Sequence, residues 1–267
     1  MMNFSWPSSP GETLALAEVL LAWSVVNYAL GRDPIGFQEI RSSLDKYSRW
    51  TYQVVARSLA LGVVTVLIVG WSLPGVALAV LTLTGALILP FGRRLLVARG
   101  IKTEAEWELC VNILVIVTAG SIVGHAQLGI AYSIIRVPLS AERLIPLIMA
   151  GTALAFAGQG ATHIVRGILD KVGTVPRARA GSEEIDTSEY NRGRVIGNLE
   201  RGLMLLTVAL GSYAALGFLV AAKGLIRIKE FEDRDFAEYF LVGTLASVLA
   251  ALVLGLLVRT AFLEWWV

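Results

Sequence analysis

The sequence predicts an all-α fold, a polytopic transmembrane helix bundle of six to seven spans. Hydrophobic residues make up 55% of the 267 residues, charged residues only 16%, and the mean hydropathy is +0.67. Soluble domains hold about 25% charged residues, so this composition excludes an ordinary soluble protein. It also excludes a disordered chain, which would be poor in hydrophobic residues. Cys110 is the single cysteine, which excludes a disulfide scaffold.

Seven apolar stretches account for the predicted spans. They approach the length of about 20 residues that a helix needs to cross a hydrocarbon core of about 30 Å. The first stretch carries Glu18 and Asn27, and a count without it gives six spans. In order along the chain, the stretches are 14–30, 54–73, 76–91, 109–130, 144–165, 202–222 and 236–258.

The basic residues predict the orientation of these spans. Cytoplasmic loops of membrane proteins are enriched in Lys and Arg. With seven spans, the segments 32–57, 92–108, 166–201 and the C-terminus fall on one side and hold 17 of the 23 Lys and Arg residues. The sequence therefore predicts a multi-pass protein of the cell inner (plasma) membrane, with the N-terminus outside and the C-terminus cytoplasmic.

We expect one transmembrane domain over residues 1–267, with two distinctive connections. Over 34–50, apolar residues recur at helical spacing with basic residues between them. This pattern predicts an amphipathic helix, either lying on the anionic inner leaflet or packed under the bundle. Residues 172–190 are the longest polar connection, which predicts a mobile cytoplasmic loop.

Small residues at four-residue spacing, such as Ala251 and Gly255, predict close contact between helices. We expect this contact within the bundle, and a homodimer is the alternative.

Five ionisable residues near the cytoplasmic ends of the predicted spans form a first candidate site. An arginine at a helix end commonly extends to the interface, but an acidic residue gains nothing from anionic lipid. Glu200 is therefore expected to pair with Arg166, Arg201 or Arg57. The cluster is either a set of structural ion pairs or a substrate- or proton-binding site. It consists of Arg57, His163, Arg166, Glu200 and Arg201.

A second charged cluster falls on the predicted outer hairpin after the sixth span. Its basic residues lie on the predicted outer side, where the positive-inside rule expects few. Acidic residues three or four positions away neutralise their charge. We expect span six to continue as a helix beyond the bilayer, either as a salt-bridged, solvated helix end or as an anion- or partner-binding site. The cluster consists of Lys223, Arg227, Glu230, Arg234 and Glu238.

No metal site, cofactor or nucleic-acid partner is expected. The two histidines, His125 and His163, are predicted at opposite sides of the membrane, and no phosphate-loop or dinucleotide motif is present. The net charge of +2 does not indicate nucleic-acid binding. The Gly158-Gln159-Gly160 tripeptide predicts a helix distortion within span five. Glu108 is expected to add negative charge to the first turn of span four.

Three segments resemble an uncharacterised bacterial family of multi-span membrane proteins, catalogued as a domain of unknown function. Residues 193–201 resemble its G-R-x-I-G-x-L-E-R segment, 222–227 its A-K-x-x-x-R element and 234–244 its R-x-x-x-E-Y-x-x-x-G-T element. The resemblance covers about 193–258, and the N-terminal part of the chain departs from the family. It implies a helical membrane protein whose charged positions in the last two helices form a motif, and it implies no activity.

The sequence favours a non-catalytic scaffold or sensor that binds anionic inner-leaflet lipid, a protein partner or a second copy. The middle of the predicted spans is almost free of charge, whereas ion pathways usually place carboxylates there. A small-solute or ion transporter or channel is the alternative, favoured by the number of spans and the distortion at 158–160. An intramembrane lipid-modifying enzyme is a third hypothesis, which depends on the cytoplasmic cluster alone.

Overall fold

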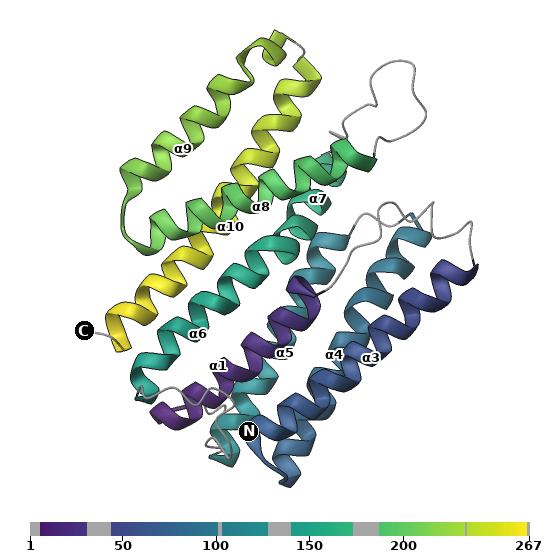
Figure 1. Cartoon of the computed structure of the whole chain (residues 1–267), viewed down its shortest axis with the longest axis vertical. Helices are drawn as coiled ribbons and strands as arrows, with labels where there is room; N and C mark the ends of the chain where they lie inside the picture. Colours follow the sequence, from purple (N-terminus) through teal and green to yellow (C-terminus); the bar gives the residue numbers. More distant parts are fainter. Residues whose placement is uncertain are drawn as a thin grey trace.

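The computed structural model describes residues 6–30, 44–100, 103–127, 140–172, 187–232 and 234–265, and this part of the chain contains helices and no strand. The helices lie side by side in one bundle (Figure 1). Five helices are long and apolar enough to cross a membrane. The prediction of an all-α bundle with several apolar spans is therefore confirmed.

The first helix lies in the centre of the bundle. α1 (Pro10–Ser24) begins at a capping box between Ser9 and Glu12, and continues into the π-helical segment η1 (Val25–Ala29). The backbone N–H groups of Ser8 and Ser9 donate to the Glu12 carboxylate and lower the pKa of this group below its usual range. Together, α1 and η1 cover the predicted stretch 14–30.

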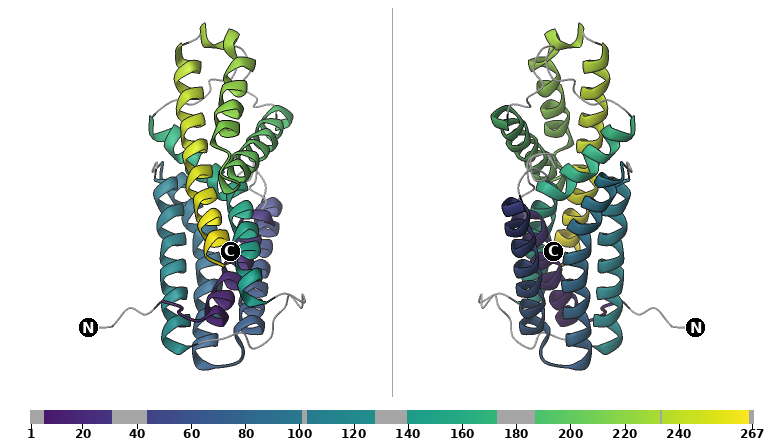
Figure 2. Two further views of the ribbon diagram at one scale, coloured as in Figure 1. Left: turned by 90° about the vertical axis from the view of Figure 1, so that its left-hand side faces the viewer. Right: turned by 90° about the vertical axis from the view of Figure 1, so that its right-hand side faces the viewer.

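Three apolar helices pack on one side of α1. α3 (Leu44–Val69) and α4 (Leu73–Ala98) form an antiparallel hairpin, and α5 (Glu104–Ala126) packs against α4. Figure 2 shows the three helices running alongside one another. Their buried aliphatic side chains form a core with α1, and these residues are Leu16, Val19, Ile68, Val69, Leu78, Ala119 and Val123.

The predicted distortion in span five is confirmed. α6 (Ala141–Ala155) continues through a π-helical segment, η2 (Phe156–Gly160), into α7 (Ala161–Val172). Gly158 and Gly160 both fall in η2. Because glycine is a poor helix former, the regular α-helical hydrogen bonds are more easily replaced by π-helical ones here. The span is continuous from Glu142 to Val172.

The predicted span 202–222 is wrong, because the chain turns back in its middle. α8 (Thr187–Ala209) ends and α9 (Tyr213–Ile226) begins after a three-residue turn, and the two helices form a hairpin. Gly211 occupies the left-handed region at φ +71°, which a glycine adopts without strain. Figures 1 and 2 show the turn near the middle of the molecule's longest axis.

The α8–α9 hairpin packs against the last helix, α10 (Arg234–Trp265), through α8. Gly255 of α10 faces Val208 of α8 so closely that a larger residue would collide, and Ala251 is also buried. The close contact predicted for Ala251 and Gly255 is therefore made within the bundle.

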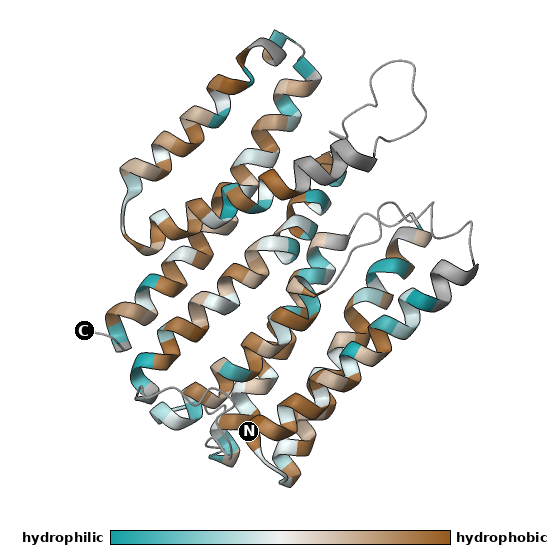
Figure 3. Ribbon diagram, viewed as in Figure 1, coloured by the Kyte–Doolittle hydropathy of each residue, from teal (hydrophilic) through white to brown (hydrophobic). Residues whose placement is uncertain are grey.

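The end of α9, the 3-10 segment η3 (Ile228–Glu232) and the start of α10 extend beyond the other helices (Figure 1). Figure 3 shows hydrophilic residues here and toward the upper ends of α3 and α4. The start of α1 and the end of α10 lie in the opposite half of the molecule (Figure 2).

Two predicted connections fall largely outside the described residues. Of the predicted amphipathic helix 34–50, residues 44–50 form the first turns of α3. Of the predicted loop 172–190, Val172 ends α7 and residues 187–190 begin α8. The remaining residues of both segments lie outside the described part of the chain.

Candidate functional site

A buried ion pair joins α4 and α5 inside the bundle. Arg93 Nη2 lies 3.2 Å from Glu108 Oε2, and the Glu108 side chain is completely buried. Burying two charges costs several kcal/mol for each ion unless the pair is well hydrogen-bonded, so further partners are expected around it. Both residues lie within candidate membrane spans, Leu73–Leu96 and Ala105–Ala126.

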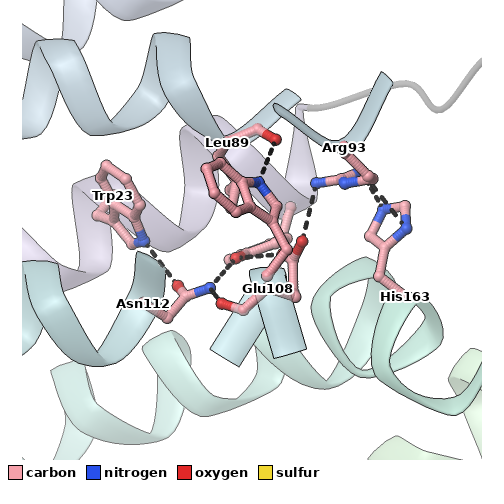
Figure 4. Close-up of polar contacts among 8 residues, drawn as sticks. Trp23, Leu89, Arg93, Glu108, Asn112 and His163 are labelled. Atoms are coloured by element: carbon pink, nitrogen blue, oxygen red, sulfur yellow. Dashed lines mark hydrogen bonds and ion pairs between the residues drawn. The ribbon is translucent and has the colours of Figure 1, made fainter. Parts of the chain in front are cut away.

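Arg93 also contacts the imidazole of His163 on α7. The distance from Arg93 Nη1 to His163 Nε2 is 2.5 Å, and both residues are buried. A guanidinium only donates hydrogen bonds, so His163 accepts with a neutral ring nitrogen. Arg93 therefore lies between a carboxylate on one side and a neutral imidazole on the other (Figure 4).

A chain of hydrogen bonds extends from the Glu108 carboxylate to α1. The Tyr28 hydroxyl donates to Glu108 Oε1 at 2.7 Å, and the Asn112 amide donates to the Tyr28 hydroxyl at 2.6 Å and to the Glu108 carbonyl at 2.7 Å. The Trp23 indole donates to Asn112 Oδ1 at 3.0 Å (Figure 4). Each of these side chains is buried, so with Arg93 and His163 the network joins five elements, α1, η1, α4, α5 and α7, away from the surface. We call Trp23, Tyr28, Arg93, Glu108, Asn112 and His163 the buried network.

The two π-helical segments meet beside this network. Tyr28 of η1 and Phe156 of η2 make an edge-to-face ring contact with centroids 5.0 Å apart. Single-turn π segments within helices occur frequently at functional sites. Their coincidence with the buried network marks this region of the bundle as the leading candidate site.

Arg201 of α8 binds the distorted segment η2. Its Nε donates to the Ala157 carbonyl at 2.7 Å, and its Nη2 contacts the Gly158 carbonyl, Thr162 Oγ1 and Asn198 Oδ1 at 2.5–3.2 Å. A π segment changes the helical bonding pattern, and the buried Arg201 guanidinium satisfies carbonyls there. The sequence placed Arg201 at a helix end, whereas the structure places it against the middle of a candidate span.

Glu200 pairs with Lys223 across the α8–α9 hairpin, with 2.5 Å between Glu200 Oε2 and Lys223 Nζ. The expectation that Glu200 pairs with Arg166, Arg201 or Arg57 is therefore wrong. The two predicted clusters were assigned to opposite sides of the membrane because span 202–222 was taken as continuous. The hairpin removes that separation and brings one residue of each cluster into contact.

The aromatic residues of α10 flank the basic residues of α9. Lys223 Nζ lies 5.7 Å from the ring centroid of Phe240, and the Arg227 guanidinium lies 5.7 Å from that of Phe236. Residues of α8, α9 and α10 therefore meet around Lys223.

The remaining predicted site residues lie in different places. Arg57 is half-buried on α3 and donates to the Leu30 carbonyl at 2.7 Å, at the end of α1 and η1. Arg166 follows His163 by one turn, and its charge acts on both His163 and Arg201. Arg234 and Glu238 pair at 3.0 Å on the exposed start of α10. Glu230 lies in η3, and its side chain is outside the described part of the structure.

Five residues of the buried network were not identified from the sequence. Glu108 was explained as a first-turn acid, but it faces the core and binds Arg93 and Tyr28. The spacing of Glu108 and Asn112 by one helical turn within an apolar run was the available signal. Neither Trp23 nor Tyr28 carries a comparable sequence signal.

No group of three potential metal ligands occurs among the described residues. Comparison with known proteins gives no match to any family model, curated protein or solved structure.

Proposed function

We propose that this chain is a multi-pass inner-membrane transport protein for a small solute or ion, and that the buried network is its proton-binding site. The observation that carries this proposal is Arg93 held between Glu108 and His163 inside three candidate spans. Ionisable residues within membrane spans are costly, and they commonly mark ion pathways and proton relays.

The chemistry of the network favours the proton. Glu108, His163 and Tyr28 all belong to residue types that bind and release protons. A proton on His163 would turn its accepting nitrogen into a donor and end the hydrogen bond from Arg93. A proton on Glu108 would remove the charge that holds Arg93 on the other side. Proton binding at either residue therefore changes which neighbour Arg93 contacts.

The buried network favours transport over a scaffold or sensor role, whereas the sequence favoured the scaffold or sensor. The scaffold was preferred because the middle of the predicted spans lacked charges. Arg201 binds the middle of the span Glu142–Val172, and Arg93, Glu108 and His163 add buried ionisable residues within spans, which favours transport. A scaffold or sensor is the second candidate, favoured by the end of α9 and start of α10 that extend beyond the other helices (Figure 1).

The proposed topology has six crossings and one hairpin. The crossings are α1 with η1, α3, α4, α5, α6 with α7, and α10, whereas α8 and α9 enter and leave on one side. The segments 30–57, 92–108, 166–201 and 223–238 then share that side and hold 20 of the 23 Lys and Arg residues. The positive-inside rule makes that side cytoplasmic. The N-terminus stays outside, and the C-terminus moves outside as well.

Proton flux through the purified protein tests the proposal. Liposomes that contain the protein and an internal pH-sensitive dye are given a potassium gradient, and valinomycin sets the membrane potential. We expect potential-driven proton flux that Glu108→Gln abolishes. Glu106→Gln is the matched control, because Glu106 lies on the same helix but is exposed and pairs with Lys171. Flux no faster than in protein-free liposomes, or unchanged flux in Glu108→Gln, would overturn the proposal.

A further inference from the structure

The turn between α8 and α9 lies within the apolar part of the spans that surround it. Leu205 and Val208, at the end of α8, pack in one core with Ala153 of α6, and Val208 also faces Gly255 of α10. Ala153 lies roughly a third of the way from the start of the candidate span Glu142–Val172, and Gly255 lies roughly a third of the way from the end of the antiparallel span Phe236–Glu264. The turn is therefore at membrane depth, short of the end of the bundle where α1 begins.

This turn exposes polar backbone groups. The first N–H groups of a helix have no partner within the helix. At the start of α9 the N-cap residue is Ser212, and its side chain makes no capping hydrogen bond. Ser212 and Tyr213 are exposed, and Leu210 is 73% exposed. Irregular backbone does not occur in contact with hydrocarbon, because each unsatisfied group would cost several kcal/mol.

A cation lies against the same turn. The Arg259 guanidinium of α10 contacts Gly211, and within the described residues Arg259 makes no ion pair with a carboxylate. An arginine that lacks a counter-ion in a span is stabilised by water drawn toward it or by local thinning of the bilayer. The turn and Arg259 thus have the same requirement for hydration.

α9 is also too short for the bilayer. Its 14 residues give a length of about 21 Å, against a hydrocarbon core of about 30 Å. Polar groups bound it at both ends, with the Glu200–Lys223 pair at one and Ser212 at the other. A short apolar segment is accommodated by thinning of the surrounding bilayer.

We infer that the α8–α9 hairpin is re-entrant and that water reaches its turn from the outer side, through a bilayer thinned beside α9. Water satisfies the N–H groups at the start of α9 and solvates Arg259. This hydrated surface is separate from the buried network and needs no transport activity.

Cysteine accessibility tests this inference in the full chain. In a Cys110→Ala background, Ser212→Cys and Phe218→Cys are exposed to a membrane-impermeant maleimide on the outer side of intact spheroplasts. Phe218 is the matched control, because it is 73% exposed on α9 yet lies well within the apolar helix. Both variants must elute as the parent protein does in gel filtration.

We expect Ser212→Cys to react at least ten times faster than Phe218→Cys from outside. Equal, slow reaction at the two positions would show that lipid or a second copy covers the turn, and would overturn the inference. Reaction of Ser212→Cys from the cytoplasmic side alone would also overturn it. Because labelling needs no flux, this result is independent of the proton assay.

Discussion

Arg93 makes two buried polar contacts, each with a side chain of a different helix. Its guanidinium bridges Glu108 and His163, so removing it leaves a carboxylate buried without its counter-ion. Removing one partner of a buried ion pair costs about 3–5 kcal/mol, whereas replacing both partners by apolar residues is often neutral. The cost of removing one partner and the cost of replacing both can be measured separately.

Arg93→Met and Glu108→Leu are each expected to lower the free energy of unfolding by about 3–5 kcal/mol. The double variant is expected to lose less than either single variant, because no charge is left uncompensated. Unfolding in mixed detergent micelles, followed by circular dichroism, measures all four proteins of the cycle. Additive losses in the double variant would mean that the two side chains do not interact as described.

The α8–α9 hairpin depends on the left-handed backbone conformation of Gly211 in its turn. Gly211 has φ +71°, where a side chain is strained by about 1–2 kcal/mol, and the Arg259 guanidinium also occupies the space beside it. Glycines inside α9 have no such role, because Gly217 has open space where a side chain would be.

Gly211→Ala and Gly217→Ala are therefore expected to change stability in opposite directions. We expect Gly211→Ala to destabilise the protein by about 1–2 kcal/mol, and Gly217→Ala to stabilise it by up to about 1 kcal/mol, because alanine is the better helix former. Thermal unfolding in detergent compares the two variants. A neutral Gly211→Ala would contradict the left-handed turn.

The sequence predicted the elements better than their ends and partners. Hydrophobic stretches gave α3, α4, α5, α6 with α7, and α10, because length and apolar composition suffice for a span. The same criterion failed at 202–222, since the apolar run continues through the turn and Gly211-Ser212 interrupts it for only two residues. The Gly158-Gln159-Gly160 distortion was predicted because its cause is local.

The buried network could not be predicted in the same way. A charged residue near a helix end has a sufficient local explanation as a capping or interfacial residue, as for Glu108 and Arg93. Their pairing depends on how α4 and α5 rotate against each other, and His163 joins only because α7 packs on α5. Those contacts are set by tertiary packing, on which helical periodicity gives no information.

For the whole molecule, the proposed topology with a re-entrant hairpin changes the side of the membrane on which the C-terminus is predicted. Six crossings place both termini outside, whereas the seven spans predicted from the sequence place the C-terminus in the cytoplasm. The proposed arrangement gathers 20 of 23 basic residues on one side instead of 17, which agrees better with the positive-inside rule.

Fusion reporters on the C-terminus separate these topologies. Alkaline phosphatase fused after Val267 is expected to be active, because it folds only outside the inner membrane, and green fluorescent protein fused there is expected to be dark. A fluorescent fusion with an inactive phosphatase would support seven spans and contradict the re-entrant hairpin.

Proton flux through the Arg93→Met/Glu108→Leu double variant in liposomes distinguishes a transport role of the buried network from a purely structural one. If the buried network serves transport, this variant is expected to fold, to keep most of its stability and to show flux no greater than protein-free liposomes. Flux at the wild-type rate would show that the network only stabilises the bundle and has no role in proton transport.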